Sequence, residues 1–148
     1  MITVDTYTNA NEASRAFGSD SAIMGGGTLL MGALNYGRQN FTKIIRITDP
    51  VMKQIADAGD RIAIGAGVTM SEVIRSRDLA FLAPVAQSVG GPAIRNMATL
   101  GGNLFAGTPY GDFTVALLAL DGIVKYANGS EQDLEGFLAS RGNRKDVD

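Results

Sequence analysis

The chain has 148 residues, of which 45% are hydrophobic and 19% charged, and its formal net charge is −2. This length is typical of one domain, and the composition is that of a folded globular protein rather than a disordered chain. The 13 Lys and Arg residues are scattered, which argues against nucleic acid as a partner. No run approaches about 18 consecutive apolar residues, so no membrane span is expected. The N-terminal residues lack the features of a signal peptide, and we expect a cytoplasmic location.

Two residue types are absent from the sequence. Without cysteine, the chain can form no disulfide, no thiolate zinc site and no cysteine-ligated iron–sulfur cluster. Without histidine, it lacks the commonest general base and the commonest metal ligand. If the protein takes part in a reaction, we therefore expect a bound cofactor to carry the chemistry.

The first 50 residues predict a βαβαβ unit. Residues 9–17 predict a short helix capped by Asn9, and SAIM at 21–24 predicts a strand that runs into GGGT. Residues 28–37 have helical spacing and end at Gly37. Residues 43–48 are β-branched and predict a strand that ends before Asp-Pro.

The remaining residues predict a second set of elements. Residues 61–67 predict a strand, and Thr69 with Glu72 predicts a capping box that begins a helix reaching about Arg75. Helices are expected over 82–90 and 112–122, the second ending at Gly122. A hairpin with an Asn-Gly turn is expected over 123–134. The sequence then ends on a polar tail where a further layer is needed to bury the helix and hairpin, which predicts a piece of a longer protein.

Glycine is in excess, with 19 residues, and nine of them lie in tight clusters at 25–27, 65/67, 90–91 and 101–102. GGGTLL at 25–30 lies between a strand and a helix, where backbone N–H groups and the Thr28 hydroxyl can bind a phosphate. The loop is not a Walker A motif, because no Lys follows, and Leu30 breaks the G-x-G-x-x-G pattern. This motif alone leaves phosphate binding and a tight turn that binds nothing equally open.

The other clusters differ in what they indicate. Gly65 and Gly67 favour a strand end leading into a capped helix, and Gly90 and Gly91 favour a helix stop. TLGGN at 99–103 offers two glycines, a hydroxyl and an amide, and Asp112 follows nine residues after Asn103. A carboxylate accepts hydrogen bonds from sugar or polyol hydroxyls, although Asp112 alone could simply cap its helix. Together, the two glycine segments and the carboxylate favour a nucleotide with an extended polyol arm, the shape of FAD.

Three segments in order, AIMGGGTLL, IAIGAGVTMSEV and IRNMATLGGNLFAGTPYGDFTVALLALDGIVKY, resemble the FAD-binding domain of the molybdenum hydroxylases. This domain is the medium subunit or middle domain of enzymes of the xanthine dehydrogenase and carbon monoxide dehydrogenase type. The most specific part is R-N-x-A-T-L-G-G-N at 95–103, with Asp112 beyond it. The resemblance implies a two-part α/β (α+β) fold of the PCMH type with FAD stretched between the parts. The parts are a small βαβαβ unit (1–50) and a larger mixed-sheet unit (51–148), the latter incomplete because the family continues further.

The resemblance also implies which residues bind FAD. Backbone amides from the first glycine cluster, with the Thr28 hydroxyl, would hold the pyrophosphate, and a second cradle would lie on the other side of the FAD. Asp112 would accept hydrogen bonds from flavin polyol hydroxyls, and Val89 would make an apolar contact. The implied set is Ile23, Met24, Gly25, Gly26, Gly27, Thr28, Leu29, Leu30, Val89, Thr99, Leu100, Gly101, Gly102, Asn103, Thr108 and Asp112.

The family further implies partners. Substrate would be oxidised at a molybdopterin centre on one partner subunit, and electrons would pass through 2Fe-2S clusters on an iron–sulfur subunit to this FAD. NAD or another acceptor would then receive them. The absence of cysteine agrees with clusters carried on other chains. No metal ligand and no catalytic residue is expected in this chain.

Two other interpretations stay open. A UDP-N-acetylenolpyruvoylglucosamine reductase-like flavoenzyme also has a GGG-S/T-x-L loop, although the R-N-x-A-T-L-G-G-N run favours the molybdenum hydroxylases. A non-catalytic remnant of the fold, acting as an interaction module, is the alternative from another functional class. Oxidases that attach flavin through His or Cys are disfavoured, because this sequence has neither residue.

Overall fold

The computed structural model describes residues 1–106 and 111–141. Its first 50 residues confirm the predicted βαβαβ order. The elements are β1 (Thr3–Tyr7), α1 (Ala10–Ala16), β2 (Ser21–Met24), α2 (Leu30–Asn35) and β3 (Lys43–Ile47). Asn9 caps α1 as expected, since its side chain accepts hydrogen bonds from the N–H groups of Asn11 and Glu12.

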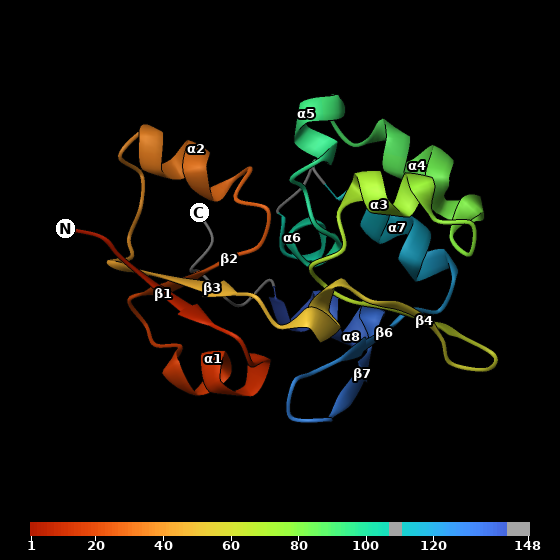
Figure 1. The fold of residues 1–148 in the computed structure, drawn as a ribbon, viewed down its shortest axis with the longest axis horizontal. Coiled ribbons are helices and arrows are strands. Elements are labelled where there is room, and N and C mark those ends of the chain that lie inside the picture. Colours follow the sequence, from red (N-terminus) through yellow and green to blue (C-terminus); the bar gives the residue numbers. More distant parts are fainter. Residues whose placement is uncertain (107–110, 142–148) are drawn as a thin grey trace.

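The three strands form a parallel sheet in the order β1-β3-β2. The central strand β3 buries two consecutive residues, Ile44 and Ile45, because both faces of a parallel sheet are covered. Figure 1 shows α1 and α2 on opposite sides of this sheet. The strands are parallel, so their carboxyl ends lie at one edge, and the GGGT loop leaves the sheet at that edge after Met24.

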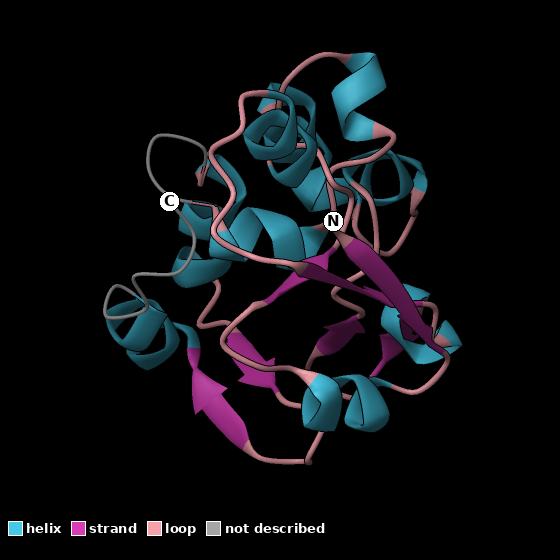
Figure 2. Ribbon diagram, turned by 90° about the vertical axis from the view of Figure 1, so that its left-hand side faces the viewer, coloured by secondary structure: helices cyan, strands magenta, loops and turns pink. Residues whose placement is uncertain are grey.

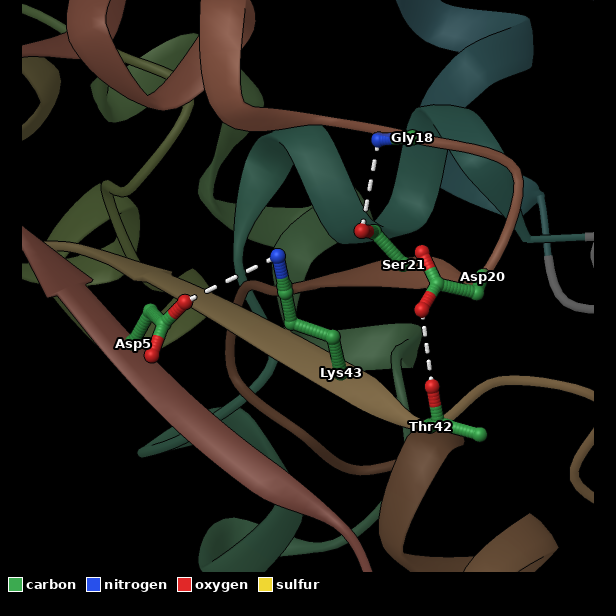
Figure 3. Close-up of polar contacts among 6 residues, drawn as sticks. All are labelled: Asp5, Gly18, Asp20, Ser21, Thr42 and Lys43. Carbon is green, nitrogen blue, oxygen red and sulfur yellow. Dashed lines mark hydrogen bonds and ion pairs between the residues drawn. The ribbon is translucent and has the colours of Figure 1, made fainter.

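Polar contacts fasten the beginnings of these strands (Figure 3). Asp20 accepts a hydrogen bond from the Thr42 hydroxyl at 2.8 Å, and this bond is the main cause that lowers the pKa of its carboxyl. Lys43 Nζ lies 3.9 Å from Asp5 Oδ2 and joins β3 to β1. These contacts are exposed, so they contribute to strand register more than to the free energy of unfolding.

Residues 51–106 are mainly helical. The elements are β4 (Ile55–Asp57), β5 (Ile62–Ile64), α3 (Met70–Arg75), α4 (Ala83–Ser88), α5 (Pro92–Arg95) and α6 (Leu100–Phe105), with 3-10 turns at Pro50–Lys53 and Ala80–Leu82. β4 pairs antiparallel with β5. The Thr69–Glu72 capping box that begins α3 is confirmed. The helix predicted over 82–90 is α4, which ends before Gly90, a residue in the left-handed region at φ 53°.

Residues 111–141 contain α7 (Asp112–Ala119), β6 (Ile123–Lys125), β7 (Glu131–Asp133) and α8 (Leu134–Arg141). The hairpin is confirmed, but its turn differs from the two-residue Asn-Gly turn. The Tyr126 N–H donates to the Ser130 carbonyl, and Gly129, at φ 85°, has positive φ while Asn128 does not. The loop is therefore a three-residue turn in which Gly129 occupies the left-handed position.

The end of α7 also differs from the prediction. Gly122 was expected to stop the helix, yet Asp121 adopts the left-handed conformation at φ 51°. The N–H of Asp121 donates to the Leu118 carbonyl, and that of Gly122 donates to the Leu117 carbonyl. This is the Schellman pattern, in which Gly122 is needed for space because a Cβ there would stand 2.9 Å from the Leu117 carbonyl oxygen.

One hydrophobic core lies among the helices of the second part. Its members come from the 68–137 range: Val68, Met70, Val73, Leu79, Leu82, Ala86, Leu100, Leu104, Phe113, Leu134 and Phe137. In Figure 2 the strands lie towards one side of the molecule and most helices towards the other. The fold is thus mixed α/β, as predicted, and its sheets are small. A mixed sheet was predicted after residue 50, whereas the strands described there form two antiparallel pairs.

The outer face of α7 stays uncovered. Val115 is 67% exposed and Leu118 38%, and Ile123 of β6 is exposed as well. Among residues 1–106 and 111–141, no helix is both long and apolar enough to cross a membrane.

Candidate functional site

The two glycine segments lie in direct contact. We call residues 25–28 the first glycine loop and residues 99–103 the second glycine segment. A Cβ built on Gly26 would overlap the Met97 carbonyl oxygen, and one built on Gly25 would stand 2.8 Å from Thr99 Oγ1. Both positions therefore need glycine, Gly26 because the backbone of Met97 packs against it and Gly25 because the Thr99 side chain does. The two segments therefore touch at Gly25 and Gly26, and the placement of FAD between two cradles stays a prediction.

Backbone pairing holds the second glycine segment in place. Thr69 and Thr99 form an antiparallel bridge. The N–H groups of Leu100 and Gly101 donate to the carbonyls of Val68 and Ala66, both at 2.8 Å, and the Met70 N–H donates to Ala98. These bonds join the second glycine segment to the residues that lead into α3, so its position is set by the helical core.

The N–H groups of the second glycine segment are already used. Besides those of Leu100 and Gly101, the Gly102 N–H donates to Thr99 Oγ1 at 3.1 Å, and the Asn103 N–H donates to the Thr99 carbonyl. The segment is the first turn of α6, with Thr99 as its cap. These four N–H groups are therefore not free to form a second backbone cradle, and a contact of residues 99–103 with FAD through other atoms stays a prediction.

In the first glycine loop, by contrast, the backbone N–H groups have no hydrogen-bond partner among the described residues. Among the described residues, no hydrogen bond uses a backbone N–H of residues 25–30. Gly27 is buried at φ 73°, and its conformation turns the chain from β2 towards α2. Successive unpaired N–H groups form a concave surface that binds anions. These residues therefore fit a pyrophosphate, and no carboxylate belongs to the loop.

Apolar side chains flank this loop. Ile23 is 52% exposed, and Leu29 and Met97 are each 49% exposed. Met24, Thr28 and Leu30 are half-buried. The combination of unpaired amides and exposed apolar side chains suits a ligand that has both an anionic group and a flat hydrophobic part.

The other predicted site residues lie outside the first glycine loop. The Leu100 side chain belongs to the hydrophobic core, Asn103 is buried on α6, and half-buried Val89 packs against the core at the end of α4. Asp112 is exposed in the first turn of α7, whose cap residue is Gly111, so the capping role considered for Asp112 is wrong. Thr108 lies outside the described residues.

Three further glycines are explained by packing. A Cβ on Gly65 would overlap the backbone of Met52, and one on Gly67 would stand 2.9 Å from the Met52 carbonyl oxygen. One on Gly101 would stand 2.9 Å from the Cβ of Ala66. The interpretation of Gly65 and Gly67 as a structural turn is confirmed, and Gly101 needs no ligand to account for it.

Sequence reasoning missed Met97 and Met52. Each contributes a main-chain carbonyl that lies against a glycine. Every residue type has this carbonyl, so the sequence does not show that Met97 and Met52 take part. The expected absence of a metal ligand stays a prediction. The described part of the chain holds no group of three or more acidic side chains placed to bind a metal ion.

Comparison with known proteins identifies the family. Residues 1–145 match the model of the FAD binding domain in molybdopterin dehydrogenase, and the chain belongs to this family of oxidoreductase domains. FAD is the cofactor that the family binds. The match decides against the reductase-like alternative, which rested on the first glycine loop alone.

Two relatives from Paenarthrobacter nicotinovorans are each 30% identical to the chain. One is the nicotine 6-hydroxylase medium subunit, matched over 72% of this chain and 39% of the relative. The other is the 6-hydroxypseudooxynicotine dehydrogenase complex subunit alpha, matched over 91% of this chain and 46% of the relative. The chain thus spans less than half the length of these two relatives, and both are subunits of larger assemblies.

Solved structures share the fold. A carbon monoxide dehydrogenase from Hydrogenophaga pseudoflava, which lacks the Mo-pyranopterin moiety, has a TM-score of 0.84 at 24% identity and covers 93% of this chain and 52% of its own. Quinoline 2-oxidoreductase from Pseudomonas putida 86 has a TM-score of 0.74 at 21% identity, covering 90% and 50%. At these identities the likeness establishes the fold.

Proposed function

We propose that the chain binds FAD through the first glycine loop, within a molybdenum-containing dehydrogenase. The observation that carries this is the run of backbone N–H groups at 25–30 that bond to no described residue, in a loop held against Met97 and Thr99. These amides and the Thr28 hydroxyl hold the pyrophosphate, and Ile23 and Leu29 contact the apolar part of the cofactor. FAD, when bound, accepts electrons and passes them to an acceptor.

The electron source and acceptor belong to the same proposal. Electrons arrive from 2Fe-2S clusters on an iron–sulfur subunit, which receives them from a molybdopterin subunit, and leave the FAD for NAD or another acceptor. The subunit names of the two relatives and the absence of cysteine from this chain support this division. The division at residue 50 into two FAD-binding parts and the cytoplasmic location stay predictions.

A titration of the purified chain tests cofactor binding. FAD fluorescence and absorbance in the visible flavin bands should change on binding, and FMN, which has one phosphate, should bind more weakly. A chain that leaves FAD fluorescence unchanged at every concentration would support the interaction-module alternative and overturn the proposal.

Asp112→Ala tests the carboxylate. If Asp112 accepts hydrogen bonds from buried FAD hydroxyls, the variant should bind FAD more weakly by about 1–3 kcal/mol. Stability without FAD should change little, because the Asp112 side chain is exposed and forms no hydrogen bond with another described residue. Glu12→Ala is the matched control, an exposed first-turn acid on α1. Equal effects of both variants on FAD affinity would contradict the assignment.

The proposed partner subunits are tested on the intact assembly. Purified from its source by a tag on this chain, the complex should contain molybdenum, iron and FAD by metal analysis and flavin absorbance. Recovery of the chain alone, without iron or molybdenum, would contradict the electron-transfer role while leaving the FAD titration as a separate result.

A further inference from the structure

Arg95 and Asn96 begin the most specific motif of the sequence. They make no contact between the two glycine segments, and their side chains bond to two different helices. Arg95 Nη1 donates to the Gln87 carbonyl at 3.0 Å and to the Val89 carbonyl at 3.5 Å, and also to the Gly90 carbonyl. Asn96 Oδ1 accepts a hydrogen bond from Ser71 Oγ at 2.6 Å.

The Arg95 side chain binds carbonyls at the end of α4 that have no partner within the helix. A helix leaves its last carbonyls without partners and carries partial negative charge at that end. The half-buried guanidinium satisfies the carbonyls of the turn at 87–90 with a positive charge. This fixes the turn that contains Val89, the residue for which the family resemblance implies an apolar contact with FAD.

The Asn96 contact joins the same short segment to α3. Ser71 lies in the first turn of α3, two residues after Thr69, and Thr69 pairs with Thr99. Between these anchors, α5 and the next turn are internally bonded, since the N–H groups of Met97 and Ala98 both donate to the Ile94 carbonyl. A shift of the anchors therefore moves the Met97 carbonyl against which Gly26 packs.

We infer that Arg95 and Asn96 are positioning residues for the cofactor site, which rests on the proposed FAD function. They clamp residues 91–98 between α4 and α3, so that this segment presents a fixed surface to the first glycine loop. The motif R-N-x-A-T-L-G-G-N is thus a clamp followed by a helix start, and its first two residues support FAD binding from outside the site.

The test compares FAD titrations of the full chain carrying Arg95→Met, Arg95→Lys, Ser71→Ala or the control Arg77→Met. Arg77 is exposed, and its side chain bonds to no described residue. The Kd for FAD should rise at least 10-fold in R95M. R95K should recover part of the affinity, because lysine keeps the charge but not the planar fork of donors. S71A should give a smaller rise, and R77M should match the unchanged chain.

Two further readouts separate positioning from general destabilisation. At saturating FAD, the visible circular dichroism of the bound flavin should change in R95M and return towards its original form in R95K. In the chain without FAD, amide hydrogen exchange of Ala98, Leu100 and Gly101 should quicken in R95M by about 10-fold, with exchange in β5 unchanged. If R95M does not fold, R95K and S71A carry the same comparison.

The outcomes are distinct. Unchanged Kd and flavin dichroism in R95M would overturn the inference while leaving the FAD proposal standing. If the original chain binds no FAD, the proposed function and the cofactor role of the clamp fail together. Hydrogen exchange then still tests whether Arg95 holds residues 91–98 in place. Equal exchange at 98–101 in R95M and the original chain would show that it does not.

Discussion

At the scale of single residues, Gly26 is the position in the first glycine loop that tolerates a side chain least. Its α-carbon faces the Met97 carbonyl, which belongs to a segment 71 positions later in the chain. Any side chain must push the two backbones apart and break the contact between the glycine segments. Gly32, in contrast, has open space around it within α2.

We expect Gly26→Ala to lower the free energy of unfolding by about 1–3 kcal/mol, the usual range for overpacking. Gly32→Ala is the matched control and should raise it by up to about 1 kcal/mol, because alanine is the better helix former. Urea denaturation of both variants measures the difference. Equal stability of G26A and the original chain would mean that the two segments are not in contact in solution.

At the scale of elements, caps decide where helices begin. The second glycine segment is rich in glycine, yet it forms the start of α6 because Thr99 caps it and Leu100 and Leu104 are buried in the core. The tertiary contacts override the low helix propensity of Gly101 and Gly102. Similarly, the sequence was expected to end on a polar tail, but residues 134–141 form helix α8. Leu134 and Phe137 lie one turn apart in this helix and are both buried.

The capping box of α3 gives a pH-dependent prediction. The Glu72 carboxylate accepts from the Thr69 N–H at 2.7 Å and from the Thr69 hydroxyl, and these bonds, the first above all, lower its pKa below the usual 4.5. The folded-state pKa is depressed, so the stabilisation is present above pH 4.5 and is lost as pH falls through the folded-state value.

Glu72→Ala should therefore cost about 0.5–2 kcal/mol of stability at pH 7, the range for losing a helix cap. The difference from the original chain should shrink as pH falls below 4.5, where the carboxylate becomes protonated. Urea denaturation from pH 3 to 7, with Thr69→Ser as a control that retains the hydroxyl, measures this. A difference that does not vary with pH would show that the charge of Glu72 does not contribute.

At the scale of the whole molecule, the core is distributed unevenly. Its main cluster comes from residues 68–137, whereas residues 1–50, all of them described, contain three buried hydrophobic residues: Ala13, Ile44 and Ile45. The three-stranded sheet has little core of its own, and the glycine contacts join it to the helical part.

We expect residues 1–50 to be unfolded when expressed alone, because a chain of this size with so small a core is marginal. Residues 51–148 should keep a helical circular dichroism spectrum, since the main cluster lies within them. A cooperative thermal transition in the 1–50 peptide would contradict this and would show that the sheet is an independent unit.

Much of the local structure followed from sequence because its causes are local. Asn9, the Thr69–Glu72 pair and the β-branched run at 43–48 each act on their immediate neighbours, so the βαβαβ order and the start of α3 could be predicted. β4 and α8 were missed because they are short and depend on a distant partner or on burial.

The sequence by itself determined that two glycine segments matter, and the motif at 95–103 identified the family to which the chain belongs. Only the tertiary structure decided what each glycine does. Gly26 and Gly101 make room for carbonyl and Cβ atoms far along the chain. The amides at 100–103 are used in hydrogen bonds, whereas those at 25–30 bond to no described residue. The physical reason is that the partner of each glycine is a backbone carbonyl or Cβ of a distant segment, and which segment comes close depends on how the whole chain folds.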